Sequence, residues 1–132
     1  MKPLERILAA AAANPRHIIL PEGGDPRVAE AARRLTEGGL ARVSLMDGPE
    51  IEGVNMIRPA KEPDLPELAD HWHRMRSAKG MTAAQALIEM RDPIRQAAMR
   101  VRLGKADGTV AGAVATTADT VRAALQIIGR AP

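Results

Sequence analysis

The sequence predicts an α/β fold in which a mainly parallel β-sheet is covered by α-helices. Short apolar segments with strand character alternate with longer segments whose apolar residues recur every three or four positions. Asp-Pro pairs, which place an N-cap before a first-turn proline, begin two of the helical segments. The 132 residues are 45% hydrophobic and 27% charged, which is typical of one globular domain and argues against wholesale disorder.

The first segment, Met1–Ala13, is predicted to form an amphipathic helix that ends at Asn14-Pro15. At helical spacing its apolar stripe consists of Leu4, Ile7, Leu8 and Ala11. A secretory signal is the alternative interpretation, and the short, leucine-poor apolar stretch argues against it.

The next segments predict a strand, a helix and two more strands. His17–Leu20 has the pattern of a short buried strand, and a turn at Pro21–Gly24 leads to a helix capped by Asp25. The residues of this helix that should face the core are Val28, Ala31, Ala32 and Leu35. After its end at Gly38-Gly39, strands are expected at Ala41–Met46 and Val54–Ile57.

The second half of the chain is predicted to be mainly helical. A helix follows the proline-rich connector Pro63–Pro66 and runs to about Lys79, with a buried stripe of Leu65, Leu68, Ala69, Trp72 and Met75. Thr82 caps a helical segment, and Asp92-Pro93 starts another that ends at Gly104. Its core-facing residues should be Ile94, Ala97, Ala98 and Val101. A strand at Val110–Val114 and a helix from about Thr116 to Gly129 complete the pattern.

Composition argues against several classes of function. Because the chain has no cysteine, its residues form no disulfide, thiolate metal site or cysteine nucleophile, and we expect a cytoplasmic protein. No apolar run approaches the ~18 residues of a membrane helix. The dense basic stripe or stacking aromatic residues typical of nucleic-acid binding are missing. Neither a membrane nor a nucleic acid is therefore expected as a partner.

Motifs for metals and bound cofactors are missing as well. His71 and His73 are two positions apart, so on a helix they point in different directions and do not form a metal-binding pair. The sequence has neither a dinucleotide-binding glycine fingerprint nor a P-loop. Glu22 and Asp25 resemble a carboxylate pair, but turn and cap roles explain them. We expect no metal and no resident cofactor.

The segment Gly108–Arg122 has the pattern of an anion-binding site. Small residues lead from a predicted strand to a helix whose N-cap, Thr116, lies three residues before Asp119, as in a capping box. Free N–H groups at such a helix start attract anions, and Arg122 lies one turn further along. The alternative is a surface ion pair between Asp119 and Arg122, which contributes roughly 0.2–0.5 kcal/mol.

Arg76 is a second candidate phosphate ligand, near the C-terminal end of a predicted helix. Cations stabilise that end of any helix, so a solvated helix end is the alternative explanation. Unlike Arg74, Arg76 lies four residues after Trp72, at the edge of the buried stripe. Fifteen of the 19 basic residues are Arg, which fits bidentate phosphate binding and fits genomic composition equally.

Three segments of the chain carry a family resemblance. They are Ile18–Arg27 (IILPEGGDPR), Arg74–Gly80 (RMRSAKG) and Met99–Gly129 (MRVRLGKADGTVAGAVATTADTVRAALQIIG). In this order they resemble the opening portion of the phosphate acetyltransferases, which are closely similar to the phosphate butyryltransferases. The resemblance implies a three-layer αβα fold of the isocitrate-dehydrogenase-like type, of which this chain would be an incomplete N-terminal portion.

The resemblance also implies reversible transfer of an acetyl group between acetyl phosphate and coenzyme A. Family members bind both substrates in a cleft between two αβα domains, usually as dimers. A base deprotonates the coenzyme A thiol, which attacks the acetyl phosphate carbonyl directly, so coenzyme A is a substrate and no cofactor is implied. We therefore expect coenzyme A or acetyl-CoA and acetyl phosphate or phosphate as ligands, and a homodimer or a partner chain as the assembly.

Site residues follow from the same resemblance, position by position. Arg76 matches the family's ligand for the ribose phosphate of coenzyme A, and Arg122 matches the residue that binds the phosphoryl or carbonyl end. The predicted substrate-binding residues are Arg76, Arg122, Thr116 and Thr117. Two departures are that Ala115 and Ala123 stand where the family commonly has His and Pro.

Domain organisation is the last expectation. Residues 1–132 would form the N-terminal αβα domain, and the family's second domain, with its later catalytic Ser, Arg and Asp residues, has no counterpart here. We thus expect no catalytic residue in this chain and little or no acetyl transfer by it alone. The alternative function is a non-catalytic domain that binds coenzyme A or phosphate or docks on another chain.

Overall fold

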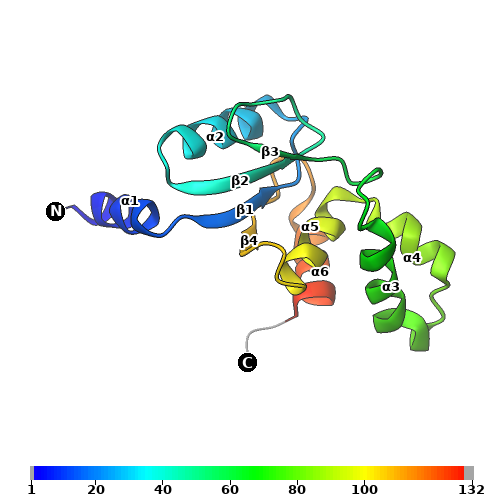
Figure 1. Ribbon diagram of the computed structural model, residues 1–132. Helices are drawn as coiled ribbons and strands as arrows, with labels where there is room; N and C mark the ends of the chain where they lie inside the picture. Colours follow the sequence, from blue (N-terminus) through cyan, green and yellow to red (C-terminus); the bar gives the residue numbers. More distant parts are fainter. Residues whose placement is uncertain (1, 130–132) are drawn as a thin grey trace.

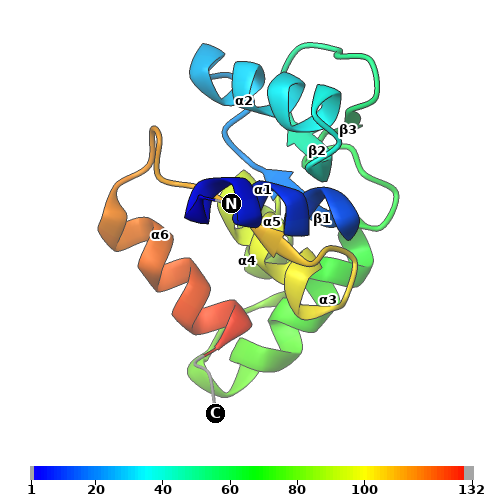
Figure 2. The same cartoon turned by 90° about the vertical axis from the view of Figure 1, so that its left-hand side faces the viewer.

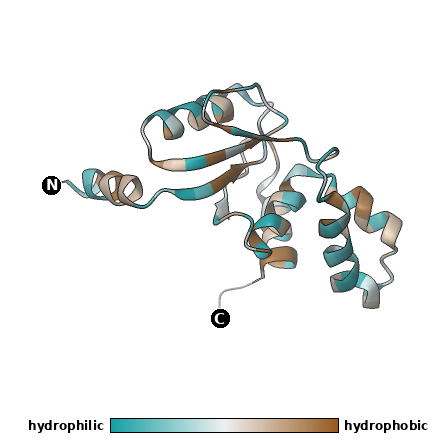
Figure 3. Ribbon diagram, in the orientation of Figure 1, coloured by the Kyte–Doolittle hydropathy of each residue, from teal (hydrophilic) through white to brown (hydrophobic). Residues whose placement is uncertain are grey.

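A four-stranded parallel sheet forms the centre of the computed structural model, which describes residues 2–129 (Figure 1). The strand order is β3-β2-β1-β4, and every neighbouring pair is parallel. The strands are β1 (Arg16–Leu20), β2 (Ala41–Met46), β3 (Asn55–Ile57) and β4 (Gly108–Thr109). β1 and β2 are hydrophobic at their carboxyl-terminal ends, where the sheet is covered on both faces (Figure 3).

Helices surround this sheet and form a second, helical part of the molecule. They are α1 (Pro3–Ala13), α2 (Pro26–Glu37), α3 (Leu65–Arg76), α4 (Ala83–Met90), α5 (Pro93–Arg102) and α6 (Thr117–Ala123). Two short segments extend α3 and α6, namely the 3₁₀ turn η1 (Ser77–Lys79) and the π-helical η2 (Ala124–Ile128). Most predicted helix starts are confirmed by their caps, since Asp25, Thr82, Asp92 and Thr116 each accept a backbone N–H in the first turn.

Helix α5 connects the two parts because it packs in both directions. Toward the sheet, Ala97 lies in a cluster with Ile19, Met46 and Ile57. On another side α5 presents Ala98 and Met99 to a helical cluster, whose largest member is Trp72 of α3. The other face of the sheet is covered by α2 through Ala32, with Val28, Ala29 and Leu35 packed at its margin. Helices on both faces confirm the predicted layered αβα arrangement.

Helix α1 forms as predicted but adds no residue to the described core. It extends away from the sheet (Figure 1), and none of its residues is buried. Leu4 and Ile7 of its apolar stripe are both 65% exposed. Met1, the first residue of the predicted segment, lies outside the described residues.

Two details of the predicted elements are wrong. In α2 the stripe includes the half-buried Ala29, whereas Ala31 is exposed. The predicted strand at Val110–Val114 does not form. The strand in this region, β4, comprises Gly108–Thr109 alone, and the residues that follow it are a loop. The apolar pattern of this segment indicated a buried strand, but Val110 and Val114 are 64% and 70% exposed and do not pack in the core. Contacts with Glu22, described below, hold the loop instead.

Candidate anion-binding site at the carboxyl edge of the sheet

The carboxyl ends of β1 and β4 lie side by side, and the loops that follow them define one edge of the molecule. After β1 comes the turn Pro21–Gly24, which leads into α2, and after β4 comes the loop 110–115, which leads into α6. α6 and η2 then run along α5 (Figures 1 and 2). Open α/β sheets bind their ligands outside the carboxyl ends of the strands, so this edge is where a site is expected.

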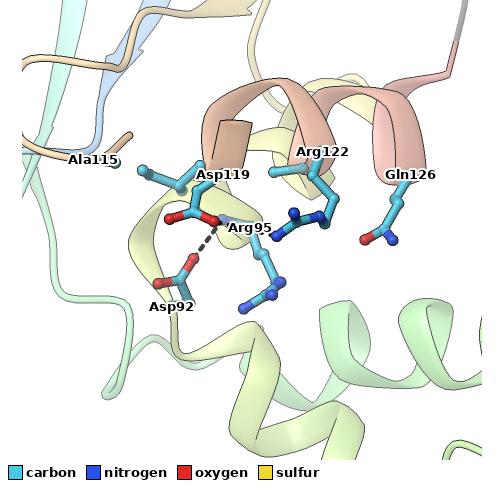
Figure 4. Close-up of a pocket in the computed structure, with 8 residues that line it drawn as sticks. Asp92, Arg95, Ala115, Asp119, Arg122 and Gln126 are labelled. Atoms are coloured by element: carbon cyan, nitrogen blue, oxygen red, sulfur yellow. Dashed lines mark hydrogen bonds and ion pairs between the residues drawn. The ribbon is translucent and has the colours of Figure 1, made fainter. Parts of the chain in front are cut away.

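A cavity of about 230 Å³ lies at this edge, between the beginning of α5 and the length of α6 and η2 (Figure 4). Its lining residues are Asp92, Ile94, Arg95, Ala115, Asp119, Arg122, Ala123 and Gln126. An adjoining, wider hollow of about 630 Å³ shares three of them, Asp92, Ile94 and Ala115, and extends along the turn after β1 to Glu22 and the start of α2. The two hollows form one groove. Ala115 and Ala123, the two positions at which the sequence departs from the family pattern, both line the smaller cavity.

Two guanidinium groups line the smaller cavity. Arg122 and Gln126 point from the α6–η2 helix toward the side on which Arg95 of α5 lies (Figure 4). Arg122 Nη1 is 3.2 Å from Asp119 Oδ1, so the ion pair considered as the alternative is present. With the Arg122 side chain 58% exposed, this pair contributes little to stability. A guanidinium has five N–H donors, so one bond to Asp119 is compatible with a bound anion.

Sequence reasoning missed Arg95. Its side chain is 36% exposed, and its Nε lies 3.8 Å from Glu89 Oε1. A local signal could have placed Arg95 in the first turn of α5, because Asp92 caps that helix three residues before it. The backbone N–H of Arg95 donates to Asp92 Oδ2 at 3.0 Å. That this turn lies beside α6 follows from packing alone.

The carboxylates of the smaller cavity already have partners. Asp92 caps α5, and Asp119 pairs with Arg122. Thr116 is the N-cap of α6, where its Oγ1 accepts the N–H of Asp119 at 3.1 Å, which is one half of the predicted capping box. The other half of a capping box is a bond from the backbone N–H of Thr116 to the Asp119 carboxylate. That bond does not form, and the carboxylate contacts Arg122 instead. Thr117 is the first residue of α6.

Glu22 makes the strongest set of polar contacts at this edge. Its Oε1 accepts the N–H groups of Gly112 and Ala113, and its Oε2 accepts those of Val114 and Ala115, all at 2.7–2.8 Å. Burial acts to raise the pKa of Glu22, but the four backbone donors outweigh it and hold the pKa below its ordinary value of 4.5. The predicted turn role of Glu22 therefore understated what it does.

Arg76 lies apart from this cavity, in the helical part of the molecule. Its guanidinium carbon is 5.5 Å from the centroid of the Trp72 ring, at the end of α3, and it is not among the residues that line either hollow. Arg122 and the cap Thr116 are thus brought together on one helix, whereas Arg76 is placed elsewhere. Residues 2–129 contain no group of three His, Asp or Glu side chains arranged to hold a metal ion. Nor does a helix in that range have the length and apolarity to cross a membrane.

Solved structures with this architecture define a class of protein. The chain superposes along its whole length on 44% of the EutD phosphotransacetylase from Staphylococcus aureus, with a TM-score of 0.87 and 29% sequence identity. A phosphotransacetylase from Streptococcus pyogenes matches 96% of the chain with a TM-score of 0.82 and 29% identity. The fold is therefore that of the N-terminal part of phosphotransacetylases.

Residues 3–132 match the phosphate acetyl/butaryl transferase family, and the chain belongs to that family. It is 79% identical, over all of its 132 residues, to a phosphate acetyltransferase of Paracoccus denitrificans. A phosphate acetyltransferase of Acetivibrio thermocellus is 37% identical over 98% of the chain. The chain spans 42% of the length of each of these two relatives. The family resemblance predicted from the three sequence segments is confirmed.

Proposed function

We propose that these 132 residues form the N-terminal αβα domain of a phosphate acetyltransferase and supply the anion-binding side of its acyl-transfer site. In this proposal the phosphate or phosphoryl group lies in the cavity between α5 and α6, where Arg122 and Arg95 donate to its oxygens. Thr116 and Thr117 begin the helix that carries Arg122. The observation that carries the proposal is that two guanidiniums and Gln126 line one cavity at the carboxyl edge of the sheet.

The proposal assigns coenzyme A as a substrate that extends from this groove to Arg76 in the helical part of the molecule, with no metal and no resident cofactor. Arg76 is proposed to bind its ribose phosphate, because it is half-buried at the end of α3 with its guanidinium over Trp72 and matches the family's ligand for that phosphate. Dimerisation or docking on a partner chain is part of the proposal. The exposed apolar stripe of α1, which includes Leu4 and Ile7, supports it. A cytoplasmic location is proposed because the chain has no cysteine.

Replacing Arg122 tests the anion site directly. We expect Arg122→Gln to weaken the binding of inorganic phosphate about tenfold, as expected for the loss of a charge-assisted contact of roughly 1.5 kcal/mol. Titration by NMR, which follows the amides of Ala115 and Asp119, measures this affinity. Arg74→Gln is the matched control, because Arg74 is a similarly exposed Arg that pairs with Asp70 four residues before it. Equal phosphate affinity in Arg122→Gln and the unsubstituted chain would refute the assignment.

Arg76 has a different test, because coenzyme A differs from 3′-dephospho-coenzyme A by the ribose phosphate alone. We expect Arg76→Gln to weaken binding of coenzyme A several-fold and to leave binding of the dephospho form unchanged, as measured by calorimetry. A loss of equal size for both ligands would show that Arg76 acts through packing on Trp72 instead. Arg74→Gln again serves as the control.

A binding domain without catalysis of its own is the second candidate. One observation favours it: the two carboxylates that line the smaller cavity are engaged, Asp92 as a cap and Asp119 in an ion pair. A general base must be free to accept a proton from the substrate. We expect an assay of acetyl-CoA formation to detect little or no turnover by this chain while calorimetry detects binding. Robust turnover that Arg122→Ala abolishes would contradict this expectation.

A further inference from the structure

We propose that the loop segment Gly112–Ala115 is a backbone anion nest whose resident anion is the carboxylate of Glu22. In this way Glu22 is the positioning residue for the groove at the carboxyl edge of the sheet. Its role in the groove rests on the proposed function, whereas the nest itself does not depend on any ligand.

The first support is the direction of four consecutive N–H groups. In a β-strand, successive N–H groups point to opposite sides, so one carboxylate cannot accept a run of four. Here the N–H groups of residues 112–115 all converge on Glu22, two on each carboxylate oxygen. The backbone turns at Gly112, where φ is +111°. Residues with a Cβ rarely adopt that conformation, so the turn that directs the N–H groups to one side needs a glycine at this position. Such concave runs of N–H groups are anion sites.

The second support is the charge that the nest requires. The four N–H donors need a group that only accepts hydrogen bonds. An ionised carboxylate is such a group, because it has about four lone-pair positions and no proton to donate. A neutral side chain, such as Gln, would direct N–H donors of its own at two of the loop amides. Charge-assisted bonds of 2.7–2.8 Å are in the strong range for N–H to carboxylate contacts.

The third support is what the nest connects. Glu22 follows the end of β1, and the last amide that it holds, Ala115, lines both hollows of the groove. The next residue, Thr116, is the cap of the helix that carries Arg122. On the opposite side of the loop, Arg27 Nη2 donates to the carbonyl oxygen of Ala113 at 3.1 Å. Glu22 therefore determines where the α6 segment begins relative to the sheet, and so where Arg122 lies relative to Arg95.

The test uses amide hydrogen exchange and chemical rescue. Glu22→Ala removes the resident anion, and we expect the amides of residues 112–115 to exchange at least tenfold faster than in the unsubstituted chain. Formate, a free carboxylate, should enter the vacated nest and restore their protection, whereas formamide, which has no charge, should not. Glu52→Gln, which removes an exposed loop carboxylate, is the control and should leave these amides unchanged.

Glu22→Gln is the second variant, which keeps the side-chain shape if the alanine variant folds poorly. Its amide NH₂ faces two loop N–H groups in place of an oxygen, so we expect two of the four amides to lose protection and the other two to keep most of it. Unchanged exchange in both variants, or equal rescue by formamide, would overturn the anion nest.

Phosphate titration separates this proposal from the proposed function. If both hold, Glu22→Ala weakens phosphate binding several-fold although Glu22 contributes no contact to it, and Arg122→Gln weakens it with the loop amides still protected. If Glu22→Ala exposes the amides but leaves phosphate affinity unchanged, the positioning role is refuted. If Arg122→Gln has no effect on phosphate while formate rescue succeeds, the proposed function fails and the nest stands.

Discussion

At the scale of single residues, the chemistry of the groove depends on which charges are already paired. Asp92 and Asp119 are occupied by local contacts, and Glu22 by four backbone donors. Arg95 and Arg122 face the same cavity from different helices. Each guanidinium has a carboxylate beside it, Asp119 for Arg122 and Glu89 for Arg95. Because a guanidinium has five N–H donors, an anionic ligand would take the donors that these contacts leave open.

Glu22 predicts how stability depends on pH. Its pKa in the folded chain is below the ordinary 4.5 because four backbone N–H groups outweigh the effect of burial. A carboxylate with a lowered pKa stabilises the fold fully above its unfolded pKa, and this contribution is lost as the pH falls through the folded pKa. We expect Glu22→Gln to cost about 2 kcal/mol at pH 7 and progressively less below about pH 4.5.

Urea unfolding between pH 7 and pH 3 measures this difference. The same comparison for Glu52→Gln should show a cost near zero at every pH, because that side chain is exposed in a loop. A cost of Glu22→Gln that stays constant down to pH 3 would contradict the assigned role of the carboxylate charge.

At the scale of elements, α5 is held to the segment before α3 by a partly buried ion pair. The Arg100 side chain is 9% exposed, and its Nη1 and Nη2 donate to the two Asp64 oxygens at 2.9 and 2.8 Å. One turn earlier, the buried Gln96 donates to the carbonyls of Pro59 and Met90. Burial acts to raise the pKa of Asp64, but hydrogen bonds from Arg100 and Lys105 hold it lowered. These contacts fix the start of α5, and with it the position of Arg95.

Breaking this pair should destabilise the fold far more than breaking a surface pair. We expect Asp64→Asn to cost about 3 kcal/mol, because it removes the carboxylate that holds both ends of the buried Arg100 guanidinium and leaves only Glu62 Oε1, at 3.9 Å, as a counter-charge. Asp70→Asn removes an exposed partner of Arg74 and should cost about 0.5 kcal/mol or less. Thermal or urea unfolding of the two variants checks the contrast, and equal costs would show that the burial of Arg100 has no energetic consequence.

At the scale of the whole molecule, the hydrophobic core is divided between the sheet and the helical part. Small residues allow α5 to contact both, since Ala97 approaches the strands and Ala98 the cluster around Trp72. At the turn after β1, a Cβ on Gly23 would overlap the carbonyl oxygen of Met46, so glycine is required for that close approach. With aromatic residues at 1% of the chain, close backbone approach replaces bulky side chains as the means of filling the core.

Helix α1 makes no contribution to this core, and a prediction follows. Because Leu4 and Ile7 are 65% exposed, replacing both by Ser should change the free energy of unfolding by about 0.5 kcal/mol or less. The same substitutions should reduce any concentration-dependent association seen by sedimentation velocity, since an apolar stripe of this kind favours contacts between chains. A large loss of monomer stability in this double variant would show that α1 packs on the domain.

Most elements of the fold could be predicted from the sequence because their signals are local. Asp25, Thr82, Asp92 and Thr116 cap helices through contacts with residues two or three positions away, so the pattern that predicts them is also the interaction that forms them. The parallel sheet followed from alternation of strands and helices. Arg122 was found because it lies one turn into a helix whose cap is visible in the sequence.

Only the tertiary structure decided the shape of the candidate site. Glu22 accepts N–H groups from residues 90 to 93 positions away, and this long-range contact turns the predicted strand at Val110–Val114 into a loop. Arg95 and Arg122 line one cavity because α5 and α6 pack together, not because of their spacing in the sequence. Periodicity and capping are patterns of residues that are neighbours along the chain. The four bonds of the Glu22 carboxylate join it to amides far away in the sequence, so they depend on where the sheet places both segments. The sequence by itself therefore determined the helices, the parallel sheet and the family. Packing determined the loop, the cavity and the charges that face it.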